Sequence, residues 1–155
     1  MIPCFAADKT LGKLAKWLRL LGFDTLYESD AAADDFIEKL ENDRIRLTRT
    51  RHIRRKSDGG KLIFVQSDHW AEQLKQIILE LGLKAAQTRP FSRCLHCNIE
   101  IVATEKDSLW GRVPDYIFET HDRFLTCPEC GKIYWSGSHT DRGLKMIQQL
   151  FQQGK

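Results

Sequence analysis

Two similar cysteine pairs constrain the fold of this 155-residue chain more than any other feature. Cys94 pairs with Cys97 and Cys127 with Cys130, each as C-x2-C, and 29 residues separate the two pairs. Each pair can direct two thiolates at one ion, so together they predict a tetrahedral four-sulfur site. Such a site selects zinc, or iron as a substitute. Because the protein supplies all four ligands, the predicted zinc is structural.

Two other uses of these cysteines are less consistent with the sequence. A redox role for the pairs is disfavoured because neither pair begins a thioredoxin-like helix. A disulfide framework is disfavoured because MIPCFAADK does not resemble a signal peptide, which makes the cytoplasm the expected location. The fifth cysteine, Cys4, lies in an apolar segment and is interpreted as a small buried side chain. No apolar run approaches the roughly 20 residues of a membrane helix, so no membrane partner is expected.

Strand and helix patterns alternate through residues 1–89, which we take as the first unit. Short apolar runs predict strands over residues 2–7, 24–28, 44–48 and 61–67. Helical spacing of apolar residues predicts helices over residues 10–23, 30–43 and 68–82. This order predicts a largely parallel sheet covered by helices. Ligands of such sheets bind beyond the carboxyl ends of the strands, where Asp8 and Thr50 are expected.

The sequence pattern changes after Pro90, so residues 90–155 are taken as a second unit. This part carries both cysteine pairs, each followed by a short strand pattern, and a polar stretch between them. A helical pattern over residues 143–153 ends the sequence. We therefore expect a small zinc ribbon followed by a C-terminal helix.

An acidic group is the first candidate for catalysis, and it consists of Asp8, Asp30, Asp34 and Asp35. Carboxylates at strand ends and helix starts can hold Mg²⁺ or Mn²⁺, which need hard oxygen ligands. Such ions can activate water and stabilise a displacement at phosphorus. Simpler roles are helix capping by Asp8 and a favourable helix-dipole contact for Asp34 and Asp35. Spacing alone favours these simpler roles.

The formal net charge is only +3, but residues 44–56 hold seven Lys or Arg and no acid. A local surplus of this kind favours a phosphate-bearing partner, and the alternative is a solvated loop. The side chains that could follow a nucleic-acid backbone are Arg49, Arg51, Arg54, Arg55 and Lys56.

A second candidate contact for nucleic acid is YWSGSH, residues 134–139. Trp135 could stack on a base and His139 could reach a phosphate. Equally, Trp135 could pack against the cysteine turns while His139 caps a turn.

Several segments together resemble the Mut-seven C-terminal ribonuclease domain family. They are DKTLGKLAKWLRLLGFDTLY, a DD-plus-apolar helix start, RLTR, FSRCLHCN and CPECGKIYWSGSH, within residues 2–140. The resemblance implies an α/β fold: a PIN-like three-layer α/β/α sandwich with a mainly parallel sheet, followed by a small zinc ribbon. It also implies cleavage of single-stranded RNA with Mg²⁺ or Mn²⁺. PIN-like domains often pair, so a homodimer is a candidate assembly.

The resemblance assigns roles residue by residue. Asp8 matches the first acid and Asp34 the second, with Asp35 as a one-position alternative; the four paired cysteines match the zinc ligands. The third acid of the family pattern LTRD is replaced here by Thr50, in LTRT.

A threonine hydroxyl supplies no charge, so Thr50 should weaken a divalent site. Asp58 or Asp68 from a neighbouring loop, or the phosphates of the RNA itself, could complete the coordination. Three functions follow: a metal-dependent endoribonuclease impaired at Thr50, an inactive RNA-binding module with a structural zinc, or a protein-interaction module.

Overall fold

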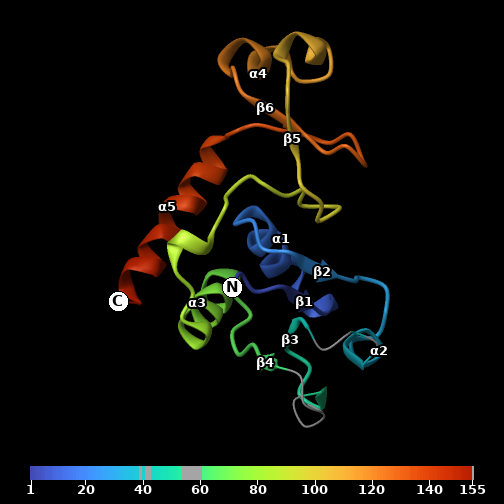
Figure 1. Ribbon diagram of the computed structural model, residues 1–155, viewed down its shortest axis with the longest axis vertical. Helices are drawn as coiled ribbons and strands as arrows, with labels where there is room; N and C mark the ends of the chain where they lie inside the picture. The colour runs from blue at the N-terminus through green and yellow to red at the C-terminus, as the bar shows by residue number, and fades with distance from the viewer. Residues whose placement is uncertain (39, 41–42, 54–60, 155) are drawn as a thin grey trace.

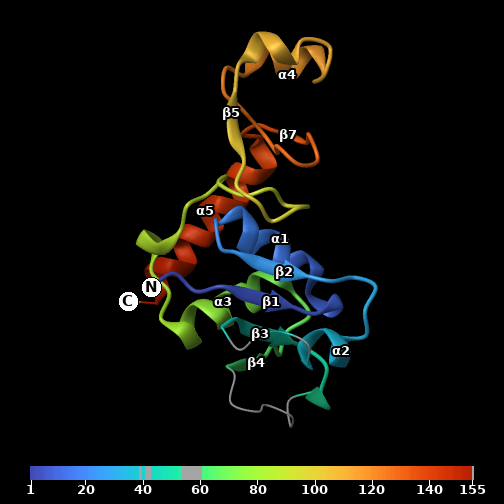
Figure 2. The same ribbon diagram turned by 45° about the vertical axis from the view of Figure 1, so that its right-hand side comes forward.

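The computed structural model describes residues 1–38, 40, 43–53 and 61–154, without the side chains of Asp34 and Glu38. In the described part, the first half forms one sheet with its helices, and a second sheet lies beyond it (Figures 1 and 2). The first elements are β1 (Phe5–Ala7), the 3-10 turn η1 (Lys9–Leu11), α1 (Gly12–Leu20), β2 (Thr25–Tyr27), α2 (Ala33–Glu38), β3 (Ile45–Thr48), β4 (Leu62–Phe64) and α3 (Trp70–Leu81). The later ones are η3 (Ala85–Gln87), β5 (Val102–Thr104), η4 (Lys106–Leu109), α4 (Asp115–Thr120), β6 (Phe124–Thr126), β7 (Ile133–Tyr134) and α5 (Ser138–Gln153).

The first sheet has the strand order β2-β1-β3-β4, and all of its neighbouring strands are parallel. The predicted α/β architecture with a mainly parallel sheet is therefore confirmed. Side chains alternate across the sheet. Phe5, Ala7 and Leu47 belong to the main core, which α1 and α3 complete with residues such as Leu14 and Leu74.

The opposite face of the sheet carries the alternate residues of the same strands. Leu62 packs there against a smaller apolar cluster that includes Ile37 of α2. Arg46, which is aligned with Leu62 in the sheet, donates from Nη2 to the carbonyl of Leu40 at 2.9 Å. Helices therefore lie on both faces of the sheet, which makes three layers (Figure 2).

Helix α2 begins at Ala33, whereas the sequence pattern predicts a start at residue 30. The backbone N–H of Asp30 donates to the Glu28 carboxylate at 2.9 Å. Such a local bond gives the backbone a non-helical partner, which accounts for the later start.

The second sheet is antiparallel in the order β5-β6-β7. A small core of Leu109, Val113 and Phe124 lies beside it. Helix α4 was not expected, because its segment was interpreted as a polar stretch. Ile117 and Phe118 of α4 pack against this core, and tertiary contact of this kind stabilises helices too short to form alone.

Helix α5 begins at Ser138, which corrects the start at residue 143 expected from the sequence. Gly143 lies against α1: a Cβ at this position would be 2.0 Å from Trp17 Cη2, so only glycine permits the close approach. Ile147 joins the main core with α1 and α3. The last helix, expected in the second unit, therefore packs on the first. No helix among the described residues is long and apolar enough to span a membrane.

Candidate functional site

The four paired cysteines form one cluster. The Sγ atoms of Cys94, Cys97, Cys127 and Cys130 all lie within 4.8 Å of one another. Four thiols at this separation could hold a metal ion such as zinc, as the C-x2-C spacing predicts. Among the described residues, no other group of three or more His, Cys, Asp or Glu side chains could hold a metal ion.

Both cysteine turns have the same backbone, and we call residues 94–99 the first knuckle and residues 127–132 the second. In the first, the N–H of Asn98 donates to the Cys94 carbonyl at 2.9 Å. In the second, Gly131 N–H donates to the Cys127 carbonyl, also at 2.9 Å. Asn98 has φ 66° and Gly131 has φ 73°, so both turns need a left-handed residue at the same position.

Hydrogen bonds to the sulfur atoms favour the thiolate form that a metal requires. The Cys97 N–H donates to Cys94 Sγ at 3.3 Å, and the Tyr134 hydroxyl lies 3.1 Å from the same sulfur. Although burial raises the pKa of Cys94, these bonds lower that pKa to about 6. Burial and neighbouring thiols raise the pKa of Cys97 to about 12. Because four thiolates repel one another, a cation is needed to hold them all ionised.

The first knuckle is fixed to the α/β unit through Arg19, whose side chain is buried. Its Nη1 donates to the carbonyls of Leu95 at 2.8 Å and His96 at 3.1 Å, while Nε donates to Thr25 O at 2.9 Å. Burial lowers the pKa of Arg19, and the nearby thiolate of Cys94 opposes that effect. The guanidinium therefore joins α1, the edge strand β2 and the first knuckle.

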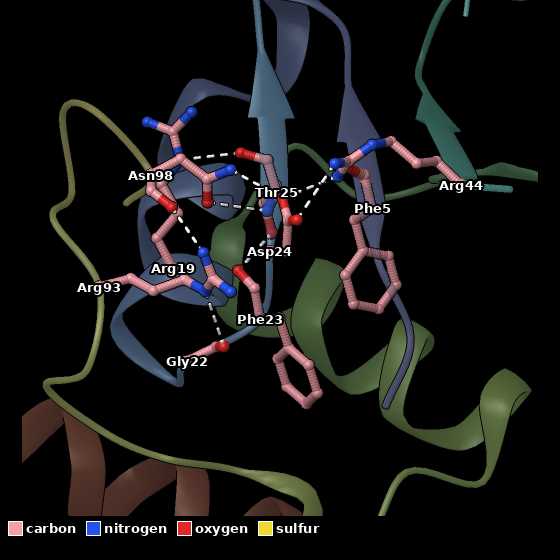
Figure 3. A network of polar contacts seen from close by, with 9 residues as sticks. All are labelled: Phe5, Arg19, Gly22, Phe23, Asp24, Thr25, Arg44, Arg93 and Asn98. Atoms are coloured by element: carbon pink, nitrogen blue, oxygen red, sulfur yellow. Dashed lines mark hydrogen bonds and ion pairs between the residues drawn. The ribbon is translucent and has the colours of Figure 1, made fainter. Parts of the chain in front are cut away.

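Asn98 makes a second connection to the same strand (Figure 3). Its Oδ1 accepts from Thr25 N–H at 2.9 Å, and its Nδ2 donates to Asp24 Oδ1 at 2.8 Å. Arg44 donates to both carboxylate oxygens of Asp24, at 2.8 and 3.1 Å. The hydrogen bonds from Arg44 lower the pKa of Asp24. Arg93 Nη1 donates to the Asn98 carbonyl at 2.7 Å.

This docking network was not predicted from the sequence. The sequence feature that could have indicated this network is Asn98, which stands at a knuckle position that usually favours glycine. Asparagine tolerates the left-handed region and adds a side-chain amide that can form hydrogen bonds.

Asp8 lies at the carboxyl end of β1 and its side chain is fully buried. One oxygen, Oδ1, accepts from Thr10 N–H at 2.9 Å and from the Thr10 hydroxyl. The other, Oδ2, accepts from the Thr48 hydroxyl and from Thr50 Oγ1 at 3.5 Å. Asp8 thus caps the turn that leads into α1, and both of its oxygens already have donors.

Thr50 contacts Asp8 at the position where the family pattern expects an acid. Its backbone N–H donates to Thr48 Oγ1 at 2.9 Å, which orients the segment after β3. Two hydroxyls therefore lie on Oδ2 of Asp8, where a further carboxylate would add negative charge. The described side chains around Asp8 supply one charged oxygen ligand group and several neutral ones.

The other predicted acids lie on or before α2. Asp35 is exposed on α2 and Asp30 is exposed before it. The side chain of Asp34 and the whole of Asp58 lie outside the described residues, and Asp68 is exposed before α3.

The predicted nucleic-acid contacts are spread over the molecule. Arg49 is half-buried and Arg51 is exposed. Trp135 is half-buried against Phe124, with ring centroids 6.4 Å apart, and so packs on the core of the second sheet. His139 is exposed in the first turn of α5. The remaining predicted contacts, Arg54, Arg55 and Lys56, lie outside the described residues.

A parallel α/β sandwich joined to an antiparallel sheet with a four-cysteine cluster defines an α/β protein with a ribbon-like unit that could hold a metal ion. Comparison with protein families is more specific: the Mut7-C RNAse domain matches residues 3–147, nearly the whole chain, and the chain belongs to this family. Neither the curated proteins nor the solved structures contain a match. Family membership supports a nuclease-like role.

Proposed function

We propose that the chain is a metal-dependent endoribonuclease acting on single-stranded RNA, with catalysis slowed by Thr50. The main support for this proposal is the buried carboxylate of Asp8 at the carboxyl edge of the parallel sheet, where α/β proteins bind ligands. The match to a ribonuclease domain family supports RNA as the substrate class.

Asp8, with Asp34 or Asp35 from α2, would hold Mg²⁺ or Mn²⁺. Alternation along β3 directs Thr48 away from the Leu47 face, toward the side covered by α2, and Asp8 bonds to Thr48 there. A bound divalent ion would supply stabilisation of negative charge at phosphorus. Thr10 and Thr48 would orient the Asp8 carboxylate through their hydrogen bonds.

The contact between Thr50 and Asp8 also favours a second candidate, an RNA-binding module that does not cleave. A neutral hydroxyl 3.5 Å from Oδ2 leaves the site one negative charge short of the family pattern. Divalent ions bind more weakly as the count of charged ligands falls. Under this candidate the protein keeps the fold and the RNA-binding surface and lacks turnover.

We further propose that the cysteine cluster holds a structural zinc, in a cytoplasmic protein of two units, residues 1–89 and 90–155. Support comes from the mutual approach of the four sulfurs. Reduced thiols and zinc are both consistent with a cytoplasmic location. A homodimer stays a prediction, to be checked by light scattering of the purified protein.

The test compares cleavage of labelled single-stranded RNA by the natural protein and by Asp8→Asn, Thr50→Asp and Thr50→Asn. Each is assayed with Mn²⁺ and without added divalent ion, since a chelator would also remove zinc. Endonuclease activity predicts Mn²⁺-dependent cleavage that Asp8→Asn lowers by about 100-fold or more. Thr50→Asp should raise the rate, whereas the similarly shaped but neutral Thr50→Asn should not.

The outcomes separate the candidates. Cleavage absent from the natural protein but present in Thr50→Asp supports the non-cleaving RNA-binding module. Cleavage that persists undiminished in Asp8→Asn contradicts an active site at this strand edge. Absence of salt-sensitive RNA binding by every variant removes both candidates and leaves a protein-interaction role.

A further inference from the structure

A cleft lies where α1, β2, the first knuckle and the start of α5 meet. It consists of a cavity of about 590 Å³ and a smaller one of about 260 Å³. Gly12, Lys16, Tyr27 and Leu95 line both cavities, so the two are contiguous. The cleft is therefore bounded by the α/β unit on one side and by the ribbon and α5 on the other.

Positively charged side chains outnumber acids in the lining of this cleft. Lys13 and Lys16 are exposed and lie three residues apart on α1, so they project from the same side of the helix. His139 reaches the larger cavity from α5. Glu28 is the one acid that lines either cavity among the described residues, and its carboxylate already accepts from the N–H of Asp30. The lining therefore suits a ligand with phosphate groups.

The rest of the lining is aromatic and apolar. Tyr27 lies directly over the start of α1, since a Cβ on Gly12 would be 2.8 Å from Tyr27 Oη. Trp17, which lines the larger cavity, is stacked on Trp70 with ring centroids 4.3 Å apart. Aromatic surfaces beside cations are the usual binding site of unpaired nucleotides, because bases stack on the rings and phosphates meet the cations.

The cleft begins close to the acidic strand edge. Asp8 caps the turn that continues into α1 at Gly12, and Gly12 lines both cavities. The Tyr27 hydroxyl lies 3.5 Å from the carbonyl of Lys9, in that same turn. The cleft therefore adjoins the turn that Asp8 caps, although Asp8 itself is buried and lines neither cavity.

We infer that this cleft binds single-stranded RNA, with phosphates at Lys13 and Lys16 and a base against Tyr27. This inference rests on the proposed function in RNA, and it names where the strand is held. A cavity of about 590 Å³ has the size of a small-molecule site. It therefore has a size that suits unpaired nucleotides.

The test measures binding of a fluorescent single-stranded oligonucleotide by anisotropy at several salt concentrations, without added Mg²⁺ or Mn²⁺. Lys13→Glu with Lys16→Glu should weaken binding about tenfold or more and lower the salt slope by about 1.4, the value for two lost phosphate contacts. The matched control is Lys145→Glu, an exposed lysine of α5 that does not line the cleft, and it should leave binding nearly unchanged.

Tyr27 supplies a second, charge-independent variant. Tyr27→Leu should weaken binding about fivefold to tenfold through lost base stacking. Tyr27→Phe keeps the aromatic ring and should retain most of the affinity of the natural protein. Thermal melts of each variant check that the fold is retained.

The outcomes distinguish failure of the cleft from failure of the proposed function. If the natural protein binds RNA but the double lysine variant binds it equally well, the cleft is overturned and the proposed function stands. Duplex RNA bound as tightly as single-stranded RNA also overturns the cleft. If the natural protein shows no salt-sensitive RNA binding, the proposed function fails, and the cleft fails with it.

Discussion

The two knuckles share one backbone and differ in what surrounds them. In the first, Asn98 is buried, and its side chain bonds to Asp24 and Thr25 of the α/β unit. In the second, Gly131 is exposed, and a Cβ placed there would meet no atom within 4 Å. The same left-handed turn therefore positions cysteines in both knuckles and serves docking in only one.

This difference shows how a small cysteine-bearing unit is attached to the larger α/β unit. The left-handed position costs least with glycine, and the second knuckle uses it. Asparagine tolerates the same conformation, and its side-chain amide can hydrogen-bond to a free backbone group of the edge strand β2. Arg19 strengthens the same contact by donating to the carbonyls of Leu95 and His96. The first knuckle is thus a joint, while the second completes the thiol cluster.

Removal of the metal should have the largest effect and should separate the two knuckles. Structural zinc sites contribute apparent binding energies of about 10–16 kcal/mol, so chelation should unfold the ribbon. We expect amide exchange to rise strongly in residues 127–132 and less in residues 94–99, where Asn98 and Arg19 hold the turn. Hydrogen exchange with and without a strong zinc chelator measures this.

The zinc content itself is the control for that experiment. Metal analysis should find about one zinc or iron per chain, and Cys130→Ser should lower that content. A chain with far less than one equivalent contradicts the structural metal. Equal loss of protection in both knuckles contradicts the docking role of the first.

Exchanging the two left-handed residues should have an intermediate effect. Asn98→Gly keeps the turn and removes two side-chain hydrogen bonds, so it should destabilise the protein by about 1–3 kcal/mol. Gly131→Asn places a tolerated residue in open space and should cost less than about 1 kcal/mol. Urea unfolding of the zinc-loaded variants gives both values. Equal costs would show that the two turns are equivalent and that docking adds nothing.

The sequence predicts the parts of this molecule that depend on local spacing. Cysteine pairs and alternating strand and helix patterns are local, and the parallel sheet and the thiol cluster were predicted from them. Helix α4 is too short for its periodicity to be distinctive, and it forms through contacts of Phe118 with the ribbon core. The start of α5 at Ser138 was likewise not predicted, because the first turn of this helix is polar and carries no apolar stripe.

The candidate site was predictable only in part, for a related reason. Asp8 and Thr50 were identified from strand ends and from the family pattern, and their contact is consistent with that reasoning. The docking contacts join residues that are far apart in the sequence, such as Arg19 with Leu95 and Asp24 with Asn98. Local sequence patterns do not reveal such contacts. The cleft beside α1 has the same origin, since its lining comes from four separate segments.

Acid pH should weaken the first knuckle slightly more than the second. Asp24 joins the first knuckle to Arg44, and the hydrogen bonds from Arg44 lower the pKa of Asp24 below its unfolded value. A carboxyl whose folded pKa is depressed stabilises the fold above the unfolded pKa, near 4, and loses that contribution as pH falls through the folded pKa. The second knuckle has no such contact among the described residues.

We therefore expect Asp24→Asn to lower stability by about 1 kcal/mol at pH 7, the size of a partly exposed ion pair, and by progressively less below pH 4. Thermal melts of the natural protein and of Asp24→Asn, run from pH 7 to pH 3, should converge at the acid end. The matched control is Asp122→Asn, which removes an exposed partner of Lys106 in the ribbon and should change the melts very little at any pH. A gap between the Asp24→Asn and natural melts that stays constant down to pH 3 would show that the Asp24 charge does not hold the joint. The two knuckles would then differ through the contacts of Asn98, Arg19 and Arg93.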